Sequence, residues 1–203
     1  MTDFDTDEES GEVDLSPFQI SWLDLSFTGA DEKIGISGLP GCRFKDTWRN
    51  LNNDLKCLQN SGVEEVFTLC TKGELNKYRV PNLLHDFAGS NITVHHYPFP
   101  DGQVPSSSSL LKMVEELRIN IMNQKKSLIH CFGGLGRSCL VAVCLMMVMD
   151  ESISPEEAID KARELRGSAA IQSVKQYNFI NDFRKLQEEV EAEDGGESRS
   201  VSR

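Results

Sequence analysis

The stretch from Ser127 to Met149 constrains the fold of this 203-residue chain more than any other. Ser127 to His130 reads as a short strand, and Arg137 to Met149 is apolar on nearly every face of a helix. A helix that is apolar all round must be covered by other elements, so this one belongs inside the molecule. The loop that joins strand and helix is short and rich in glycine. This arrangement is typical of α/β folds, in which helices cover a parallel sheet.

The rest of the chain repeats the alternation of strand and helix. Strands are predicted over residues 20–25, 65–70 and 92–96. Helices are predicted over residues 46–62, 74–87 with a break near Pro81, 107–124, 155–167 and 173–190. Ser154 and Glu157 form a capping box with Pro155 at the first helical position, which marks one helix start. We therefore predict an α/β fold with a central, mostly parallel sheet flanked by helices.

One domain accounts for this length. We expect it over residues 18–187, between an acidic disordered tail at residues 1–17 and a polar C-terminal tail at residues 188–203. Both tails are rich in acidic residues and are either solvated, mobile ends or docking segments.

Charge and composition limit the function classes. The formal net charge of −11 disfavours nucleic acid as a partner. The longest apolar run is too short to span a bilayer, and the acidic N-terminus is unlike a targeting peptide. We expect a monomer that does not bind membranes and is cytoplasmic, with a perinuclear or nuclear location as the alternative. No Cys-x-x-Cys pair occurs, and the adjacent His95 and His96 point to opposite faces of a strand, so we expect neither metal nor cofactor.

The loop after the Ser127–His130 strand carries the chemistry. Its glycines allow successive backbone N–H groups to turn inward around an anion, and the helix that follows adds the positive end of its dipole. Arg137 can close this cradle with a bidentate grip on phosphate oxygens. A thiol at the base of such donors ionises easily, which makes Cys131 a nucleophile. The predicted phosphate-binding residues are Phe132, Gly133, Gly134, Leu135, Gly136 and Arg137. The alternative is a glycine-rich turn with an incidental buried cysteine.

Such a loop predicts hydrolysis of a phosphate ester through a phosphocysteine intermediate on Cys131. Arg137 and the loop amides would stabilise charge on the transferring phosphoryl group. Ser138 can hydrogen-bond the sulfur and help it leave, and it can also cap the helix, since the two roles are compatible. His130 is expected to orient the loop, because an ionised nucleophile needs no base.

The leaving group needs a proton, and Asp101 is the candidate acid. It follows the strand over residues 92–96, at the edge where such sheets bind ligands. The competing interpretation is that Pro100-Asp101-Gly102 is only a turn. Asp86 and Asp46 are weaker candidates.

These motifs resemble a known superfamily. His130-Cys131 through Arg137-Ser138 is similar to the signature of the cysteine-dependent protein tyrosine phosphatases, and Phe99-Pro100-Asp101 is similar to their acid loop, with Phe where many members have Trp. Further stretches resemble the kinase-associated phosphatases of the dual-specificity branch: 20–23, 39–46, 72–84 and 166–178.

The resemblance implies a dual-specificity phosphatase fold without metal. It also implies hydrolysis of phosphothreonine, and of phosphotyrosine and phosphoserine. The implied partner is a cyclin-dependent kinase phosphorylated on its activation segment, and the implied role is in the cell cycle.

Several residues keep two interpretations. Cys70 has two possible roles. It could form a disulfide with Cys131 after Cys131 is oxidised, or it could be an ordinary buried residue of the core. The last helix, near residues 177–189, contacts a kinase or only packs. Gln172 and Gln176 are candidates for positioning the attacking water, as glutamines do in related phosphatases. The last set is three basic residues that either form a rim attracting a phosphorylated segment or are ordinary surface charges: Lys72, Lys77 and Arg79.

Two rival functions remain at this point. A non-catalytic phosphoprotein-binding module would use the same loop, but it would need neither the thiol nor the acid. A phosphoinositide phosphatase would favour lysines inside the loop, and residues 132–136 supply none.

Overall fold

The computed structural model of the protein describes residues 12–25 and 33–200, with side chains up to residue 192. Its centre is a five-stranded sheet with strand order β1-β2-β7-β5-β6. These strands are β1 (Ser21–Trp22), β2 (Ile34–Ser37), β7 (Lys126–His130), β5 (Val63–Thr68) and β6 (Thr93–His96). β1 pairs antiparallel with β2, whereas all other neighbours in the sheet run parallel. The predicted fold class, an α/β domain with a mostly parallel sheet, is confirmed.

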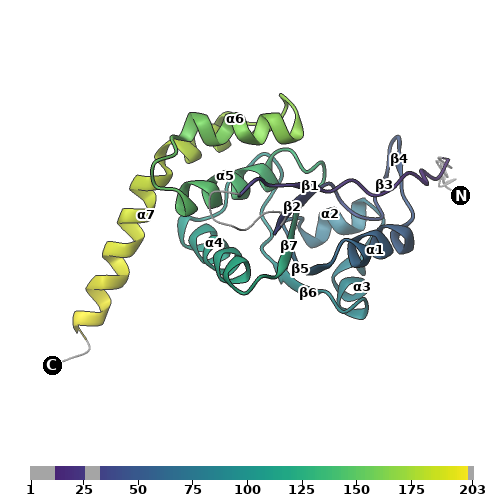
Figure 1. Ribbon diagram of the computed structural model, residues 1–203, viewed down its shortest axis with the longest axis horizontal. Coiled ribbons are helices and arrows are strands. Elements are labelled where there is room, and N and C mark those ends of the chain that lie inside the picture. Colours follow the sequence, from purple (N-terminus) through teal and green to yellow (C-terminus); the bar gives the residue numbers. More distant parts are fainter. Residues whose placement is uncertain (1–11, 26–32, 201–203) are drawn as a thin grey trace, which may run out of the picture.

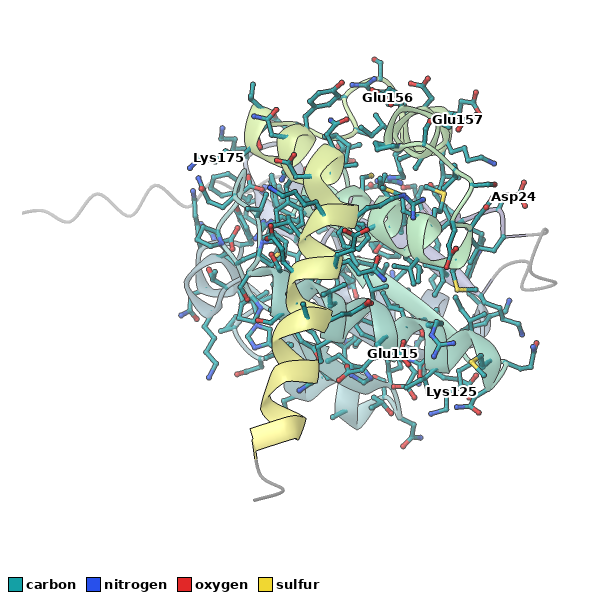
Figure 2. All side chains as sticks on the ribbon, turned by 90° about the vertical axis from the view of Figure 1, so that its left-hand side faces the viewer. Asp24, Glu115, Lys125, Glu156, Glu157 and Lys175 are labelled. Atoms are coloured by element: carbon teal, nitrogen blue, oxygen red, sulfur yellow. The ribbon has the colours of Figure 1, made fainter. Side chains whose placement is uncertain are left out.

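Helices lie on both sides of the sheet (Figure 1). One side holds α1 (Leu51–Asn60), α2 (Lys72–Lys77) and α3 (Leu83–Gly89). The other holds α4 (Ser107–Met122), α5 (Arg137–Met149), α6 (Pro155–Arg166) and α7 (Val174–Ser200). Parallel strands need long crossover connections, and these helices supply them. The C-terminal part of α7 projects beyond the rest of the molecule (Figures 1 and 2).

The strand side chains alternate between two apolar clusters, one on each face of the sheet. In β5, Val66 joins the cluster of α1 to α3, whereas Phe67 joins the cluster of α4 to α7. Leu128 and Ile129 of β7 divide in the same way, because successive strand residues point to opposite faces. All four side chains are fully buried, and each such burial contributes about 1.5–3 kcal/mol.

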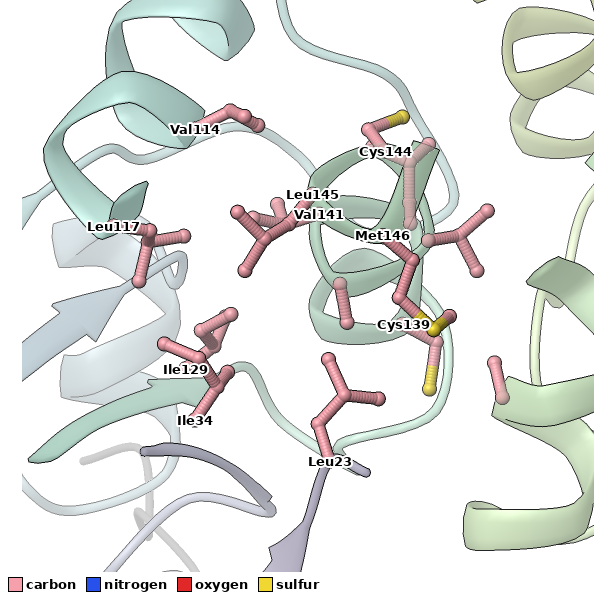
Figure 3. Packing of buried hydrophobic residues seen from close by; sticks show 14 of the residues in the cluster. Leu23, Ile34, Val114, Leu117, Ile129, Cys139, Val141, Cys144, Leu145 and Met146 are labelled. Carbon is pink, nitrogen blue, oxygen red and sulfur yellow. The ribbon is translucent and has the colours of Figure 1, made fainter. Parts of the chain in front are cut away.

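Helix α5 is the buried helix that the sequence predicts, with both ends where they were expected. All its residues from Arg137 to Met147 are buried. Val141 and Leu145 of α5 lie toward Val114 of α4 and Ile129 of β7 (Figure 3). The loop that precedes α5 is therefore attached to a helix that is packed on all sides in the core.

Local signals set the ends of two further helices. α6 begins with the predicted capping box, in which Ser154 Oγ accepts from Glu157 N–H and the Glu157 carboxylate accepts from Ser154 N–H. It ends before Gly167, whose φ of +99° favours glycine. α2 has a second capping box, formed by Thr71 and Glu74, which was not predicted.

Other predicted boundaries are wrong. β2 was not predicted, because its four residues include a glycine and give a weak strand signal. The helix expected from residue 46 starts only at Leu51, since β3 (Arg43–Phe44) and β4 (Thr47–Trp48) pair as a hairpin. The strand expected over residues 20–25 shrinks to β1, and the last helix continues past residue 190 to Ser200.

Part of the predicted acidic tail contacts the domain. The Asp14 N–H donates to the Trp48 carbonyl over 2.6 Å, and Arg49 binds the Asp14 carboxylate at 2.8 Å. Residues 1–11 of that tail, and residues 201–203, lie outside the described residues. Within residues 12–25 and 33–200, no helix combines the length and the apolar character needed to cross a membrane.

Candidate active site

The loop from Cys131 to Gly136 connects the C-terminal end of β7 to the start of α5, in the middle of the sheet. Cys131 lies at its base with 2% of its surface exposed. The backbone N–H of Gly134 donates to the Cys131 Sγ over 3.2 Å. The loop thus folds back over the sulfur, at the sheet edge where α/β folds bind ligands.

The loop carbonyls are held on its outer side by donors from elsewhere in the chain. Leu39 N–H donates to the Phe132 carbonyl over 2.9 Å, and Ile171 N–H donates to the Leu135 carbonyl over 3.0 Å. Between these two, Arg166 donates through Nη2 to the Gly133 carbonyl and through Nε to the Gly134 carbonyl. In a trans peptide the C=O and N–H point in opposite directions. The N–H groups of residues 133–136 therefore face away from these donors.

Two glycines of the loop lie in close contact with other parts of the chain. Gly134 has a φ of +67°, and a Cβ there would lie 2.5 Å from the Ser37 carbonyl carbon. A Cβ at Gly136 would lie 2.9 Å from Gln172 Oε1 and 3.2 Å from Gln176 Nε2. Only glycine fits both positions without displacing a neighbour.

Arg137 begins α5 and is fully buried. Its guanidinium forms a bidentate pair with Glu74, with Nη2 at 2.7 Å from Oε1 and Nη1 at 2.9 Å from Oε2. Nη1 also donates to the carbonyls of Leu69 and Phe99. Nε has no hydrogen-bond partner among the described residues, although Asp101 Oδ1 lies 3.3 Å away, and Nη2 uses only one of its two hydrogens, so both nitrogens can donate to an incoming anion.

Glu74 is a site residue that was not predicted from the sequence. Partial burial works to raise its pKa, but hydrogen bonds from Arg137 and from the Thr71 N–H outweigh burial and hold the pKa below its ordinary value. Glu74 is therefore ionised and fixes the orientation of Arg137. Its capping-box spacing behind Thr71, directly after a buried strand, is the signal that could have identified it.

The structure brings Asp101 to this site. Its Oδ1 lies 3.3 Å from Arg137 Nε, and 56% of its side chain is exposed. The loop that carries it is fixed by hydrogen bonds from Phe99 N–H to the Leu69 carbonyl and from Ser173 Oγ to the Gly102 carbonyl. A carboxyl group between Arg137 and solvent can exchange a proton with a bound ester or with water.

His130 and Ser138 flank the loop. His130 is fully buried, its Nε2 lies 2.8 Å from Thr68 Oγ1, and burial lowers its pKa to about 3. It is therefore neutral near pH 7, which suits an orienting group. Ser138 Oγ is buried without a hydrogen-bond partner among the described residues, and Gly136 takes the N-cap position of α5. The capping interpretation of Ser138 is therefore wrong.

Aromatic and basic side chains form one wall beside the loop. Phe132 stacks on Tyr78 with ring centroids 4.3 Å apart, and Phe44 of β3 packs against both rings. Lys77 lies 4.9 Å from the Phe44 ring centroid. Arg79 lies over Trp48 of the same hairpin at 5.3 Å. Two of the three predicted rim residues, Lys77 and Arg79, are thus held by this wall, and Lys72 begins the adjoining α2.

Gln172 and Gln176 both lie against Gly136, as the close contacts above show. Gln176 is fully buried, and its Oε1 accepts from Gln172 N–H over 3.0 Å. Cys70 is fully buried just after β5, and burial raises its pKa well above its ordinary value. Since β5 pairs with β7 up to Thr68 and His130, Cys70 and Cys131 follow neighbouring strands.

The two adjacent histidines have separate partners. His95 lies between the carboxylates of Glu65 and Glu116, whereas His96 Nε2 lies 2.9 Å from the Cys70 carbonyl. They do not converge on one ion. In the part of the chain that the structure describes, no group of three or more His, Cys, Asp or Glu side chains could hold a metal.

Comparisons with family models, with curated proteins and with solved structures all point to the same family. The family model of cyclin-dependent kinase inhibitor 3 matches residues 1–159. Over 204 aligned positions the chain is 50% identical to cyclin-dependent kinase inhibitor 3 of Rattus norvegicus and 48% identical to that of Homo sapiens, covering all of this chain and 96% of each relative. A crystal structure of kinase-associated phosphatase, with serine at its catalytic-site cysteine, matches with a TM-score of 0.82 and 48% identity. It covers 86% of this chain and 98% of that one.

The similarity extends from the sequence to the architecture, over 86% of this chain. Whole-length identity near one half and a matching fold lead to one conclusion. This chain belongs to the cyclin-dependent kinase inhibitor 3 family, whose members are cysteine-dependent, dual-specificity protein phosphatases.

Proposed function

We propose that the protein removes phosphate from phosphothreonine on the activation segment of a cyclin-dependent kinase, with Cys131 as the nucleophile. The observation that supports this most is the outward anchoring of the loop carbonyls at residues 132–135, which leaves the N–H groups of the loop for a phosphate. The kinase follows from the name of the relatives, which describes them as inhibitors of cyclin-dependent kinases.

In the first step, the Cys131 thiolate attacks phosphorus. The S–P bond forms as the P–O bond to the threonine side chain breaks, and Asp101 gives its proton to the leaving oxygen. Arg137 and the loop N–H groups bind the three non-bridging oxygens and stabilise their charge. Glu74 acts as a positioning residue, because it holds the Arg137 guanidinium at 2.7 and 2.9 Å.

In the second step, water attacks phosphorus and the S–P bond breaks. The Asp101 carboxylate accepts the proton of that water, and sulfur leaves as a thiolate. The hydroxyl of Ser138, which has no other partner among the described residues, donates to the departing sulfur. Gln172 and Gln176 lie against the loop at Gly136 and are suited to orient the water.

The substrate is a folded kinase, so contacts outside the loop contribute to recognition. Lys72, Lys77 and Arg79 supply positive charge beside the loop of an otherwise acidic protein and attract the phosphorylated segment. Helix α7 offers an exposed surface that includes Tyr177, 40% exposed, as a contact for the kinase. We place this activity in the cytoplasm or nucleus, where such kinases are found.

A side-by-side assay tests the function. The purified protein is given a cyclin-dependent kinase phosphorylated on its activation-segment threonine, and separately a phosphoinositide in mixed micelles, and released phosphate is measured. We expect turnover on the kinase that is at least about 100-fold faster than on the lipid.

Cys131→Ser is the control, because it keeps the loop but replaces the thiol. It should bind the phosphorylated kinase without releasing phosphate. Equal activity of Cys131→Ser and the unmodified protein would exclude the phosphocysteine route. Faster turnover of the phosphoinositide would overturn the proposed substrate, and binding without turnover by the unmodified protein would favour a phosphoprotein-binding module.

A further inference from the structure

Ser16 is a hydroxyl that the proposed reaction does not use. Leu15, Ser16 and Pro17 are all exposed and belong to neither a helix nor a strand. A residue before proline is restricted to extended conformations, and proline presents no N–H that needs a partner. The chain bends at Ser16, and the exposed Ser16-Pro17 pair is the dipeptide that proline-directed kinases recognise.

An arginine is already in place beside this hydroxyl. Arg49 Nη1 lies 3.5 Å from Ser16 Oγ, and Nη2 donates to the Ser16 carbonyl over 2.9 Å. The Arg49 side chain is only 12% exposed, because the buried carboxylate of Asp54 holds it through Nε and Nη2. A guanidinium fixed in this way is preorganised to bind an anion, since its rotamer is already set.

The surroundings have room for a phosphate. Ser16 lines an open groove of about 400 Å³ between the N-terminal segment and α1, and Lys56 lines the same groove. Figure 1 shows this segment passing beside the β3–β4 hairpin and α1. A group attached to Ser16 Oγ would therefore lie beside Arg49, in a groove that Lys56 also lines.

Asp14 occupies the position that such a group would take. Its Oδ2 lies 2.8 Å from Arg49 Nη1, and its Oδ1 accepts from the Ser16 N–H over 2.8 Å. The carboxylate is half exposed and carries one charge, whereas a phosphate carries nearly two at pH 7. The phosphate binds arginine more strongly and repels the carboxylate.

We propose that Ser16 is phosphorylated by a proline-directed kinase and that Arg49 then binds the phosphate in place of Asp14. The γ-phosphoryl group of ATP is transferred: the bond from Ser16 Oγ to phosphorus forms, the bond to ADP breaks, and the hydroxyl proton passes to the catalytic base of the kinase. The chain itself thereby becomes a substrate of the class of enzyme whose phosphorylated form it is proposed to act on.

A second Ser-Pro pair in the chain, Ser154-Pro155, provides an internal contrast. Ser154 Oγ donates to the Glu157 carboxylate over 2.8 Å and accepts from the Glu157 N–H. Pro155 is already inside α6. A kinase would have to unfold the first turn of α6 to reach Ser154. In the folded protein Ser16 is therefore accessible to a kinase and Ser154 is not.

Phosphate incorporation tests the acceptor. The full-length Cys131→Ser protein, which cannot remove its own phosphate, is incubated with a proline-directed serine/threonine kinase and ATP, and peptides are mapped by mass spectrometry. We expect one phosphate, on Ser16. Adding Ser16→Ala should abolish incorporation, Pro17→Ala should reduce its rate at least about tenfold, and Ser154→Ala should leave it unchanged. Incorporation at another residue, or none while a Ser-Pro peptide is phosphorylated in parallel, would overturn the proposal.

A ³¹P NMR titration tests the role of Arg49. A phosphoserine free in water has a second pKa of about 6. We expect a lower value in the phosphorylated protein and a return toward about 6 in Arg49→Lys, which keeps a positive charge for the buried Asp54 but loses the planar grip. Arg43→Lys is the matched control and should not change the titration. Identical titrations in Arg49→Lys and the unmodified protein would show that Arg49 does not bind the phosphate.

Discussion

The guanidinium of Arg137 meets two carboxylates with different surroundings. Glu74 is mostly buried, pairs in a bidentate geometry and also accepts from the Thr71 N–H, so it cannot leave its position without breaking three hydrogen bonds. Asp101 is half exposed, 3.3 Å from Nε, on a loop that reaches solvent. At the scale of single residues, the first carboxylate fixes the orientation of Arg137, and the second lies beside Arg137 at the solvent, where the proposed general acid must be.

Substitution of Glu74 by Gln should therefore impair catalysis while leaving the nucleophile intact. Without its ionic partner, Arg137 loses its fixed orientation, and misplacement of a phosphate-binding group by about 1 Å can cost about 100-fold in rate. We expect a fall of this order in kcat/KM, measured with phosphopeptide. Glu156→Gln, an exposed glutamate on α6, is the control and should match the unmodified enzyme. An unchanged kcat/KM in Glu74→Gln would argue against a positioning role.

Substitution of Asp101 by Asn should affect substrates according to their leaving groups. A threonine alkoxide needs a proton, and loss of a general acid costs about 10²- to 10⁴-fold. An aryl phosphate with an acidic phenol needs none and should be hydrolysed nearly normally. The two rates are compared in steady-state assays of the same protein. If both substrates slowed equally, Asp101 would not be the acid.

Local motifs in the sequence predict Cys131, Arg137 and Asp101 as site residues, because each belongs to a short pattern of fixed spacing. The structure places all three together. Glu74 and Arg166 were missed because their contacts with the loop join residues far apart in the sequence, 63 and 32 positions from their partners. No local pattern reports such pairings, and the capping box of Thr71 and Glu74, which was not predicted, would have marked Glu74 only as a helix-start residue.

Among the elements, the loop between β7 and α5 depends on glycine at one particular position. Gly134→Ala would require a φ of +67° and would place a methyl group 2.5 Å from the Ser37 carbonyl. We expect a loss of about 2–4 kcal/mol in unfolding free energy and of most activity, measured by urea denaturation and phosphopeptide turnover.

The neighbouring glycine supplies the matched control. A Cβ at Gly133 would meet only Leu135 Cδ1 at 4.0 Å, an ordinary contact. Gly133→Ala should stay within about 1 kcal/mol of the unmodified protein. Equal destabilisation by both substitutions would show that the alanine methyl group, and not the left-handed backbone, is responsible.

The elements around this loop were predictable to different degrees. α5 was predicted to the residue because thirteen consecutive helical residues are nearly all apolar. β2 was not predicted, although it pairs with β7, because Gly35 interrupts a strand of only four residues. Glycine is needed there, since a Cβ would lie 2.6 Å from Ile20 Cγ2. The strand character of β2 comes from its neighbours in the sheet and not from its own residues.

For the molecule as a whole, His130 predicts sensitivity to acid. Its pKa is about 3 in the folded protein and near 6.5 in an unfolded chain. The unfolded state thus binds more protons between these values, and stability is present above pH 6.5 and is lost as the pH falls toward 3. Between pH 7 and pH 5 this group alone should lower the unfolding free energy by about 2 kcal/mol.

Urea denaturation at the two pH values measures this loss. His130→Gln keeps a hydrogen-bonding side chain beside Thr68 but cannot be protonated, so its stability should change much less between pH 7 and pH 5. His85→Gln, at an exposed histidine, should behave like the unmodified protein. A loss in His130→Gln as large as in the unmodified protein would assign the acid sensitivity to other groups.

The anchored carbonyls of the loop have a practical consequence. A ring of N–H donors that is already in position before the substrate arrives binds any tetrahedral oxyanion in the same way. The inorganic phosphate released by the reaction therefore competes with the next substrate molecule for this loop. Sulfate and vanadate should compete as well, and a protein handled in phosphate buffer would look less active than it is. Raising phosphate in the assay should increase KM without changing kcat, and a kcat effect alone would place the anion somewhere other than this loop.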